Sequence, residues 1–217
     1  MLNVDMHVHT CYSKDSRMKF ESLEEAAVNN GIDVLIITDH NRIDGALKFK
    51  DYSENIEVII GEEIMTNKGE IIGLFLNKSI SPGLSPEETI IKIKEQDGLI
   101  YIPHPFDCLR SSAIKEEALY NIISDIDIIE VFNSRNVFKK DNDKALSFAN
   151  EYNILKGVGS DSHTKWEVGQ SYIEIENFKD AEEFIINMSN STLITKKSSI
   201  LVHFITKFIK IFRRNNE

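Results

Sequence analysis

The sequence predicts an α/β fold whose sheet is mostly parallel and either open or closed into a βα barrel. Short runs rich in Ile and Val alternate with amphipathic stretches at the spacing of βα units. No internal repeat, low-complexity tract or Pro/Gly-rich linker divides the 217 residues. With 41% apolar and 28% charged residues, the chain can bury one sizeable core, so we expect one main domain.

The apolar runs that we expect to form strands are 2–8, 33–38, 57–61, 71–76, 99–102, 128–132, 156–159 and 172–175. The helical patterns between them are 23–30, 86–97, 138–152 and 179–188. Ser22 and Glu25 have the spacing of a capping box, which predicts the start of the first helix at Ser22. Ser85 and Pro86 open the second helix, because proline is favoured in a first turn.

The net charge of −10 argues against a broad surface for long nucleic acid or membrane, since such surfaces need clustered Lys and Arg. Residues 196–214 carry six basic and no acidic side chains, which leaves 19 basic and 35 acidic residues elsewhere. The sequence starts without the pattern of a signal peptide. Cys11 and Cys108 fit neither a disulfide framework nor the spacing of a structural zinc site. We therefore expect a cytoplasmic protein with reduced cysteines.

Five of the six histidines follow or end a predicted strand, where βα folds assemble their sites; these are His7, His9, His40, His104 and His163. The period of two in a strand puts Asp5, His7 and His9 on one face. Neighbours on a face lie roughly 6.6 Å apart, so two imidazoles can converge on an ion about 2.1 Å from each. The alternative is two packed polar side chains, which would need partners to offset their desolvation.

Carboxylates accompany these histidines. Asp161 and His163 share a face in the same way as His7 and His9. Glu62 and Glu63 end another apolar run, and because adjacent strand residues face opposite ways, only one of them reaches the site; we favour Glu63. Asp15, in the loop after His9, is either a further oxygen ligand or a solvated loop acid.

The segments that hold these residues are DMHVHTCYSKDS, ITDHN, GEEI, IPHPFD, IEVFN and GSDSH. In this order, over residues 5–163, they resemble the PHP (polymerase and histidinol phosphatase) domain family. The resemblance implies a distorted (βα)7 TIM-like barrel over residues 1–195. Residues 196–217 would form an additional basic, amphipathic C-terminal helix packed on the barrel. The alternative for this helix is binding to a membrane surface or to a partner, although its apolar run is too broken to span a bilayer.

The resemblance also implies a cluster of two or three divalent ions, with Zn, Mn and Fe all used in the family. One ion would be held by His7, His9, Glu63 and Asp161. A second would be held by Asp15, His40 and His163. A third, near His104 and bridged by Glu63, would take either Glu70 or Glu130, which stand close to places where other members have histidine, or would be absent.

Such a cluster predicts a metal-dependent phosphoesterase, in which a metal-activated hydroxide attacks a phosphate ester of a small metabolite, nucleotide or short oligonucleotide. Asp39 and His163 are candidates for moving protons or orienting ligands. Arginines in loops after predicted strands could bind the substrate phosphate, and of these Arg135 is the first choice and Arg17 the second.

Three other functions remain open at this point. The first is a PHP domain that binds metal without turnover, and the second is a phosphodiesterase or nuclease. The third is metal-dependent amide or ester hydrolysis, for which related barrels often carry a carboxylated lysine on a strand; no lysine here is placed for that role. The sequence indicates no oligomeric state.

Overall fold

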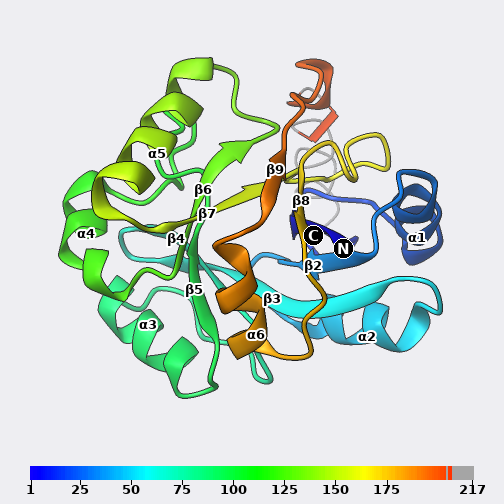
Figure 1. Ribbon diagram of the computed structural model, residues 1–217, viewed down its shortest axis with the longest axis horizontal. Helices are drawn as coiled ribbons and strands as arrows, with labels where there is room; N and C mark the ends of the chain where they lie inside the picture. Colours follow the sequence, from blue (N-terminus) through cyan, green and yellow to red (C-terminus); the bar gives the residue numbers. More distant parts are fainter. Residues whose placement is uncertain (204, 207–217) are drawn as a thin grey trace.

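The computed structural model describes residues 1–203, 205 and 206, and its sheet curves into a nearly closed barrel (Figure 1). The nine described strands lie in the order β7-β6-β5-β4-β3-β2-β1-β8-β9. They are β1 (Leu2–Val8), β2 (Val34–Ile37), β3 (Glu57–Thr66), β4 (Gly69–Leu74), β5 (Leu99–Ile102), β6 (Ile128–Asn133), β7 (Leu155–Gly159), β8 (Tyr172–Ile175) and β9 (Thr192–Ile194). The prediction of a distorted TIM-like barrel is confirmed.

The prediction of a mostly parallel sheet is wrong. Four strand pairs are parallel and four are antiparallel, the latter being β3–β4, β4–β5, β1–β8 and β8–β9. The main difference arises at β3, which runs beyond the predicted end at Gly61 to Thr66 and turns directly into β4. A connection this short can join only antiparallel strands. Gly69 closes the turn with a φ of 121°, and a Cβ there would meet the backbone of Ala113 and Ile114.

The barrel closes where the chain that follows β7 lies beside β1. Val8 forms a bridge with Ser162, and His9 N donates to the Ser162 carbonyl at 3.0 Å. The Asp5 carboxylate accepts from Ser160 N at 3.0 Å and from Gly169 N at 2.9 Å. In a fully paired barrel, a neighbouring strand would accept from the N–H groups of Ser160 and Gly169; here the buried Asp5 carboxylate accepts from them instead. Asp5 therefore holds both ends of the loop 160–169.

Helices surround the sheet (Figure 1). They are α1 (Phe20–Asn29), α2 (Asp44–Tyr52), α3 (Pro86–Lys94), α4 (Glu116–Asn121), α5 (Lys139–Tyr152) and α6 (Ala181–Met188), with a 3₁₀ turn at Ile123–Asp125. The larger apolar cluster includes Tyr101, Phe148 and Phe184 and joins the strands to the helices from α3 onward. A second cluster, including Leu23 and Phe49, packs α1 and α2 against β2.

The helix starts were only partly predicted. At α3, Ser85 Oγ accepts from Glu88 N at 3.1 Å and the Glu88 carboxylate accepts from Ser85 N at 2.9 Å, so the predicted start is confirmed. The capping box predicted at Ser22 is wrong, because α1 begins earlier, after Lys19, without a side-chain cap. Helices α2 and α4 were not predicted; they are short, and few apolar residues mark their inner faces.

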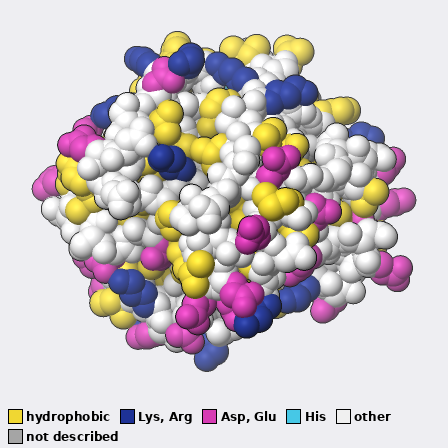
Figure 2. Space-filling model, in the orientation of Figure 1, with side chains coloured by type: hydrophobic (Ala, Val, Ile, Leu, Met, Phe, Trp, Pro, Cys, Tyr) yellow, Lys and Arg dark blue, Asp and Glu magenta, His cyan; other side chains and the backbone are white. Residues whose placement is uncertain are grey.

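The C-terminal segment is described only as far as residue 206. Residues 201–203, 205 and 206 are helical, and Val202 and Thr206 are buried. Position 204 and residues 207–217, which include most of the predicted basic helix, lie outside the described residues. Among the described helices, none has the length and apolar character needed to cross a bilayer. On the face in Figure 2, Lys and Arg side chains gather along the upper edge and no histidine is visible.

Candidate metal centre

Histidines and carboxylates from six parts of the chain meet at one end of the barrel. They come from β1 and the loop after it, from β3 and β4, and from the loops after β2, β5 and β7. The members are His7, His9, Asp15, His40, Glu63, Glu70, His104, Asp161 and His163, and the only side chain of these more than a few per cent exposed is His40, at 21%. Residues far apart in the sequence thus form one buried cluster, as predicted.

Four atoms of this cluster, two nitrogens and two oxygens, lie close to one another. His7 Nε2 and His9 Nε2 lie 3.1 Å apart. Glu63 Oε2 is 3.5 and 3.4 Å from these nitrogens, and Asp161 Oδ1 is 3.7 and 3.4 Å from them. Ligand atoms that bind one tetrahedral zinc ion at about 2.1 Å lie roughly 3.4 Å apart, so these five distances match those of ligands that share an ion. A metal ion would therefore fit between these four side chains.

The state of the two carboxylate oxygens supports this fit. Glu63 Oε2 and Asp161 Oδ1 are buried and accept no hydrogen bond of good geometry from the described residues. An ionised oxygen buried without a donor is unfavourable, and such atoms are rare in folded proteins. His40 Nδ1 lies 3.0 Å from Glu63 Oε2, and a cation bound between the four side chains would compensate both oxygens at once.

The outer nitrogens of the two histidines are held by hydrogen-bond partners. His7 Nδ1 lies 3.0 Å from Glu130 Oε1, and His9 Nδ1 lies 3.1 Å from Ser13 Oγ. Ser13 Oγ itself donates to Asp39 Oδ1 at 2.6 Å, so it accepts from His9. With protons on both Nδ1 atoms, the Nε2 lone pairs point toward each other and toward the two carboxylates, as metal ligation requires.

The second predicted group also comes together. Asp15 Oδ1 lies 3.3 Å from His163 Nε2, and Asp15 Oδ2 lies 3.5 Å from His40 Nε2. The His9 ring is 4.5 Å from the His40 ring and 4.3 Å from the His163 ring, so this group adjoins the first. The Asp161 carbonyl lies 2.9 Å from His163 Nδ1 and can accept its proton, which leaves Nε2 free to bind an ion.

Around His104, the geometry favours Glu70 over Glu130 as the acidic partner. His104 Nε2 is 2.9 Å from Glu63 Oε1 and 3.8 Å from Glu70 Oε2. Glu70 Oε1 also lies 3.6 Å from His40 Nδ1. Glu63 has one oxygen in the first group and the other beside His104, which is the bridging arrangement that the resemblance implies.

Glu130 and Asp39 lie behind the ligands instead of among them. Besides its contact with His7, Glu130 accepts from His104 N, from Tyr101 Oη and from Asn133 Nδ2, at 2.7, 3.1 and 2.9 Å. Asp39 accepts from Thr10 N, Thr10 Oγ1 and Ser13 Oγ, at 2.8, 2.6 and 2.6 Å. Both carboxylates are thus engaged by protein donors, so their geometry fits the orientation of histidines better than metal ligation or proton transfer in the cavity.

Glu62, the neighbour of Glu63 in β3, points away from the cluster. It accepts from Ser79 Oγ at 2.6 Å and from Ile80 N at 2.8 Å, on the opposite face of β3 from the cluster. The alternation of strand residues therefore separated the two neighbours correctly.

Two residues of the cluster have unusual backbone conformations. His104 and Asp161 have φ angles of 30° and 52°. Positive φ at residues other than glycine is unfavourable by about 1–3 kcal/mol each and is concentrated at functional sites. The fold therefore holds both side chains toward the cluster against this local preference.

Histidines and carboxylates of the cluster shift one another's pKa values. Burial alone would disfavour an imidazolium at His7, but Asp161, Glu130 and Glu63 surround it and raise its pKa well above the ordinary value. The same balance raises the pKa of His40 beside Glu63. In turn, although burial acts against it, these imidazolium ions lower the pKa of Glu63. Without metal, the cluster is stabilised by pairs of imidazolium and carboxylate.

Metal binding is therefore expected to release protons. A metal ligand must be a neutral imidazole, so protons held by His7 and His40 at neutral pH have to leave when an ion binds. Because the pKa values of both are raised, affinity for metal should fall as the pH is lowered through the neutral range. Calorimetric titration with Zn²⁺ in buffers of different ionisation enthalpy measures this release. Equal heats in all buffers would contradict it.

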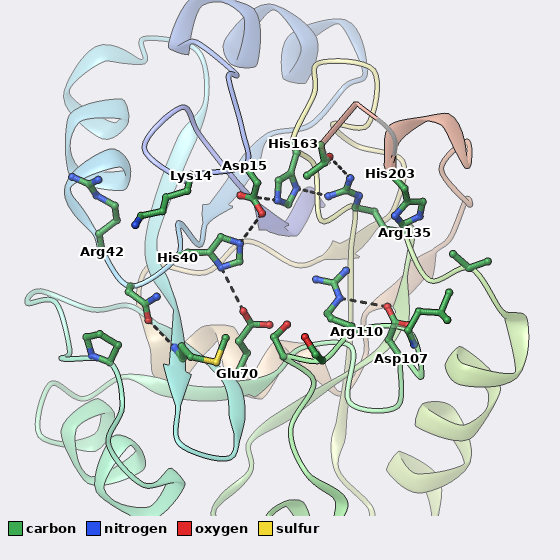
Figure 3. Close-up of a pocket in the computed structure, with 18 of the residues that line it drawn as sticks. Lys14, Asp15, His40, Arg42, Glu70, Asp107, Arg110, Arg135, His163 and His203 are labelled. Atoms are coloured by element: carbon green, nitrogen blue, oxygen red, sulfur yellow. Dashed lines mark hydrogen bonds and ion pairs between the residues drawn. The ribbon is translucent and has the colours of Figure 1, made fainter. Parts of the chain in front are cut away.

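A cavity of about 1350 Å³ opens onto the cluster (Figure 3). Asp15, His40, Glu70 and His163 reach it from the metal centre. Its other lining residues include Lys14, Arg42, Asp107, Arg110, Arg135 and His203. Arg17, predicted to bind substrate, is exposed and is not among the lining residues.

The arginines of the cavity differ in their partners. Arg110 Nη2 donates to Asp161 Oδ2 at 2.6 Å, so it supports a candidate ligand from the cavity side. Arg42 is bound through two nitrogens to Asp44, at 2.6 and 2.7 Å. The guanidinium of Arg135 is only 5% exposed and is surrounded by protein groups. Arg110 is thus the arginine of this cavity that donates directly to a carboxylate of the first group, Asp161.

The barrel and the cluster together define an α/β protein with a candidate metal centre at the C-terminal ends of its parallel strands. The model of the PHP domain family matches residues 5–204. The chain belongs to the PHP domain family, as the motifs predicted. A relative in Methanocaldococcus jannaschii, the uncharacterized protein MJ0417, is 35% identical over 215 residues, which cover 92% of this chain and 85% of the relative.

Solved structures share the fold at low identity. A two-domain protein from Bacteroides vulgatus that contains a predicted PHP-like metal-dependent phosphoesterase has a TM-score of 0.70 and 17% identity over 90% of this chain. The present chain spans 65% of that protein's length. An amidohydrolase from Chromobacterium violaceum, solved with bound sulfate and no metal, has a TM-score of 0.60 and 16% identity over 74% of this chain and 87% of its own.

Proposed function

We propose that this protein is a metal-dependent phosphoesterase that hydrolyses a phosphate ester of a small metabolite, a nucleotide or a short oligonucleotide. The observation that carries the proposal is the close approach of His7, His9, Glu63 and Asp161, with N–N and N–O distances of 3.1 to 3.7 Å. Ions bound there and in the adjoining groups would lower the pKa of a bound water and neutralise charge on phosphate oxygens. Nitrogen and oxygen ligands of this kind are compatible with Zn, Mn or Fe.

Side chains that line the cavity would bind and orient the substrate beside the ions. Asp15 and His163 face the cavity, where a substrate would lie next to the second group. Arg110 lines the same cavity and keeps a charged guanidinium beside Asp161. A guanidinium is suited to hold a phosphate oxygen through two parallel hydrogen bonds. Of the two predicted roles of His163, binding the second ion through Nε2 leaves no nitrogen to carry a proton, so we assign it the role of ligand.

Hydrolysis of amides is the second candidate, because one structural neighbour is named an amidohydrolase. That neighbour holds sulfate, a tetrahedral dianion of the same shape and charge as a phosphate group. In the present chain, Glu63 occupies the bridging position between groups, and the cavity carries arginine, which suits an anionic substrate. These features favour phosphate esters.

A screen with metal analysis tests the function. Protein purified without added metal is assayed for bound metal and then for hydrolysis of phosphate monoesters and diesters with Mn, Zn or Fe. We expect bound metal and turnover of at least one ester. Activity on bis(p-nitrophenyl) phosphate alone would identify a diesterase. Stoichiometric metal without turnover of any ester would support the alternative of a metal-binding domain without catalysis.

Replacing Arg110 by Met is expected to weaken substrate binding. Hydrogen bonds between charged groups contribute about 1.5–3 kcal/mol, so KM for the best ester should rise about 10-fold or more. Arg42→Met is the matched control, because Arg42 lines the same cavity but its carboxylate partner, Asp44, is not a candidate metal ligand. Kinetics at saturating metal, with metal content measured in parallel, separate this effect from loss of support for Asp161. An equal KM in wild type and Arg110→Met would contradict the assignment.

A further inference from the structure

We propose that the C-terminal segment, of which residues 196–203, 205 and 206 are described, forms one side of the active-site cavity and helps to position a ligand of the second ion. Arg135 is the positioning residue that connects this segment to His163. The proposal rests on the proposed function, since it concerns the side chains that would hold the second ion. It assigns Arg135 a role different from the contact with substrate phosphate predicted from the sequence.

The segment is fastened to the loops at the end of the barrel. Lys196 N donates to Ser171 Oγ at 3.1 Å, and Ser198 N donates to the Ser134 carbonyl at 2.8 Å. Lys197 Nζ donates to the Val137 carbonyl. Beyond these contacts, Ile200, His203 and Thr206 line the cavity that His163 and Asp15 also line. Figure 3 shows His203 next to Arg135, with His163 on the other side of Arg135.

Arg135 binds the segment with one side of its guanidinium. Nη2 donates to Thr206 Oγ1 at 2.5 Å and to the Val202 carbonyl at 3.4 Å. Arg135, Val202 and Thr206 are all more than nine-tenths buried. Such desolvated hydrogen bonds to a charged donor are stronger than exposed ones, and the planar guanidinium fixes their directions. The segment is therefore anchored at a defined place.

The other side of the guanidinium reaches the loop that carries His163. Nε lies 3.1 Å from Glu167 Oε1. Nη1 lies 2.8 Å from His163 Nδ1, but a His163 that binds an ion through Nε2 donates its Nδ1 proton to the Asp161 carbonyl, so the connection to His163 is made through Glu167. Glu167 Oε2 accepts from His163 N at 3.2 Å and from Thr164 N at 3.0 Å. Glu167 is 1% exposed, so its charge depends on Arg135 for compensation. Displacing Arg135 would therefore disturb the backbone at His163.

This connection should matter for the second ion and not for the first. The ligands of the first group have their own supports: Glu130 for His7, Ser13 for His9 and Arg110 for Asp161. Within the second group, the backbone of His163 is held by Glu167, and the charge of Glu167 depends on Arg135. Removing a partner that orients a ligand typically weakens metal affinity about 10- to 100-fold.

Cobalt titration followed by visible absorption tests the proposal without requiring turnover. Thr206→Val removes the nearer of the two acceptors on the segment and leaves the Val202 carbonyl. Arg135→Lys keeps the charge but cannot make the same set of hydrogen bonds. Both are expected to weaken the second binding step about 10-fold and to leave the first unchanged. Leu201→Ala is the matched control, because Leu201 belongs to the same segment and is 64% exposed. It should titrate like the wild type.

The possible results separate this inference from the proposed function. Two unchanged binding steps in Thr206→Val and Arg135→Lys would overturn the inference while the metal centre stands. Equal weakening of both steps would also overturn it, since a general loss of structure would explain the result. If thermal melting shows that Arg135→Lys is unfolded, Thr206→Val decides. No cobalt bound by the wild type would overturn the metal centre and this inference together.

Discussion

Glu63→Gln is expected to abolish most metal binding and hydrolysis. Glu63 has Oε2 in the first group, 3.4 Å from His9 Nε2, and Oε1 beside His104 at 2.9 Å. The amide keeps the size of the side chain but removes the charge that bridges these sites. Because loss of an orienting partner alone weakens metal binding about 10- to 100-fold, loss of a bridging ligand should weaken it by at least about 100-fold. Metal content after dialysis and kcat on the best ester measure the effect.

Glu62→Gln is the matched control for this substitution. Glu62 is the neighbouring residue, equally buried, and its carboxylate is bound to Ser79 and Ile80 instead of facing the cluster. It should retain metal and activity even if its stability falls. Full metal content in Glu63→Gln, or the same loss of metal in both variants, would show that the bridging role is wrong.

Gly69→Ala is expected to cause the largest loss of stability from a single methyl group. Gly69 has a φ of 121°, and the added Cβ would collide with the backbone of Ala113 and Ile114, which cannot move like the end of a side chain. Conformational strain alone is unfavourable by about 1–3 kcal/mol, and the collision adds to it. The free energy of unfolding should fall by about 3 kcal/mol or more, as measured by urea denaturation.

Gly83→Ala separates strain from collision. Gly83 also has a positive φ, of 86°, but a Cβ there would meet no atom within 4 Å. Its loss of stability should stay near the strain alone, about 1–2 kcal/mol. If the two variants lose the same free energy of unfolding, the tight approach of the β3–β4 turn to residues 113 and 114 is not a significant constraint.

The positions of most candidate ligands could be predicted because each follows a simple local rule. The alternation in β1 put His7 and His9 on one face, and the alternation in β3 chose Glu63 over Glu62. Strand ends after apolar runs located His40, His104 and His163. These rules use only neighbouring residues, so they needed no knowledge of the strand order.

Glu70 and Glu130 show where such rules end. The sequence placed Glu70 outside a strand, since the predicted run began at Ile71, whereas the residue belongs to β4. Because β4 is antiparallel to β3, its first residues lie at the end of the barrel where the parallel strands finish, and Glu70 faces the cluster. Glu130 is in β6, but its carboxylate meets His7 Nδ1 from behind. Both outcomes depend on strand direction and on tertiary hydrogen bonds, which local patterns do not contain.

Arg135 was expected to bind substrate because it follows a strand, and its partners could not be predicted in the same way. Those partners, Glu167 and Thr206, lie 32 and 71 residues further along the chain. No spacing in the sequence connects them. Only the return of the C-terminal segment to the cavity brings the three together.

The most direct measurement of the metal centre is anomalous X-ray scattering from crystals grown with Zn²⁺. We predict a peak about 2.1 Å from His7 Nε2, His9 Nε2, Glu63 Oε2 and Asp161 Oδ1. Zinc bound only elsewhere on the molecule, or no peak while these four side chains keep their positions, would contradict the proposed metal centre.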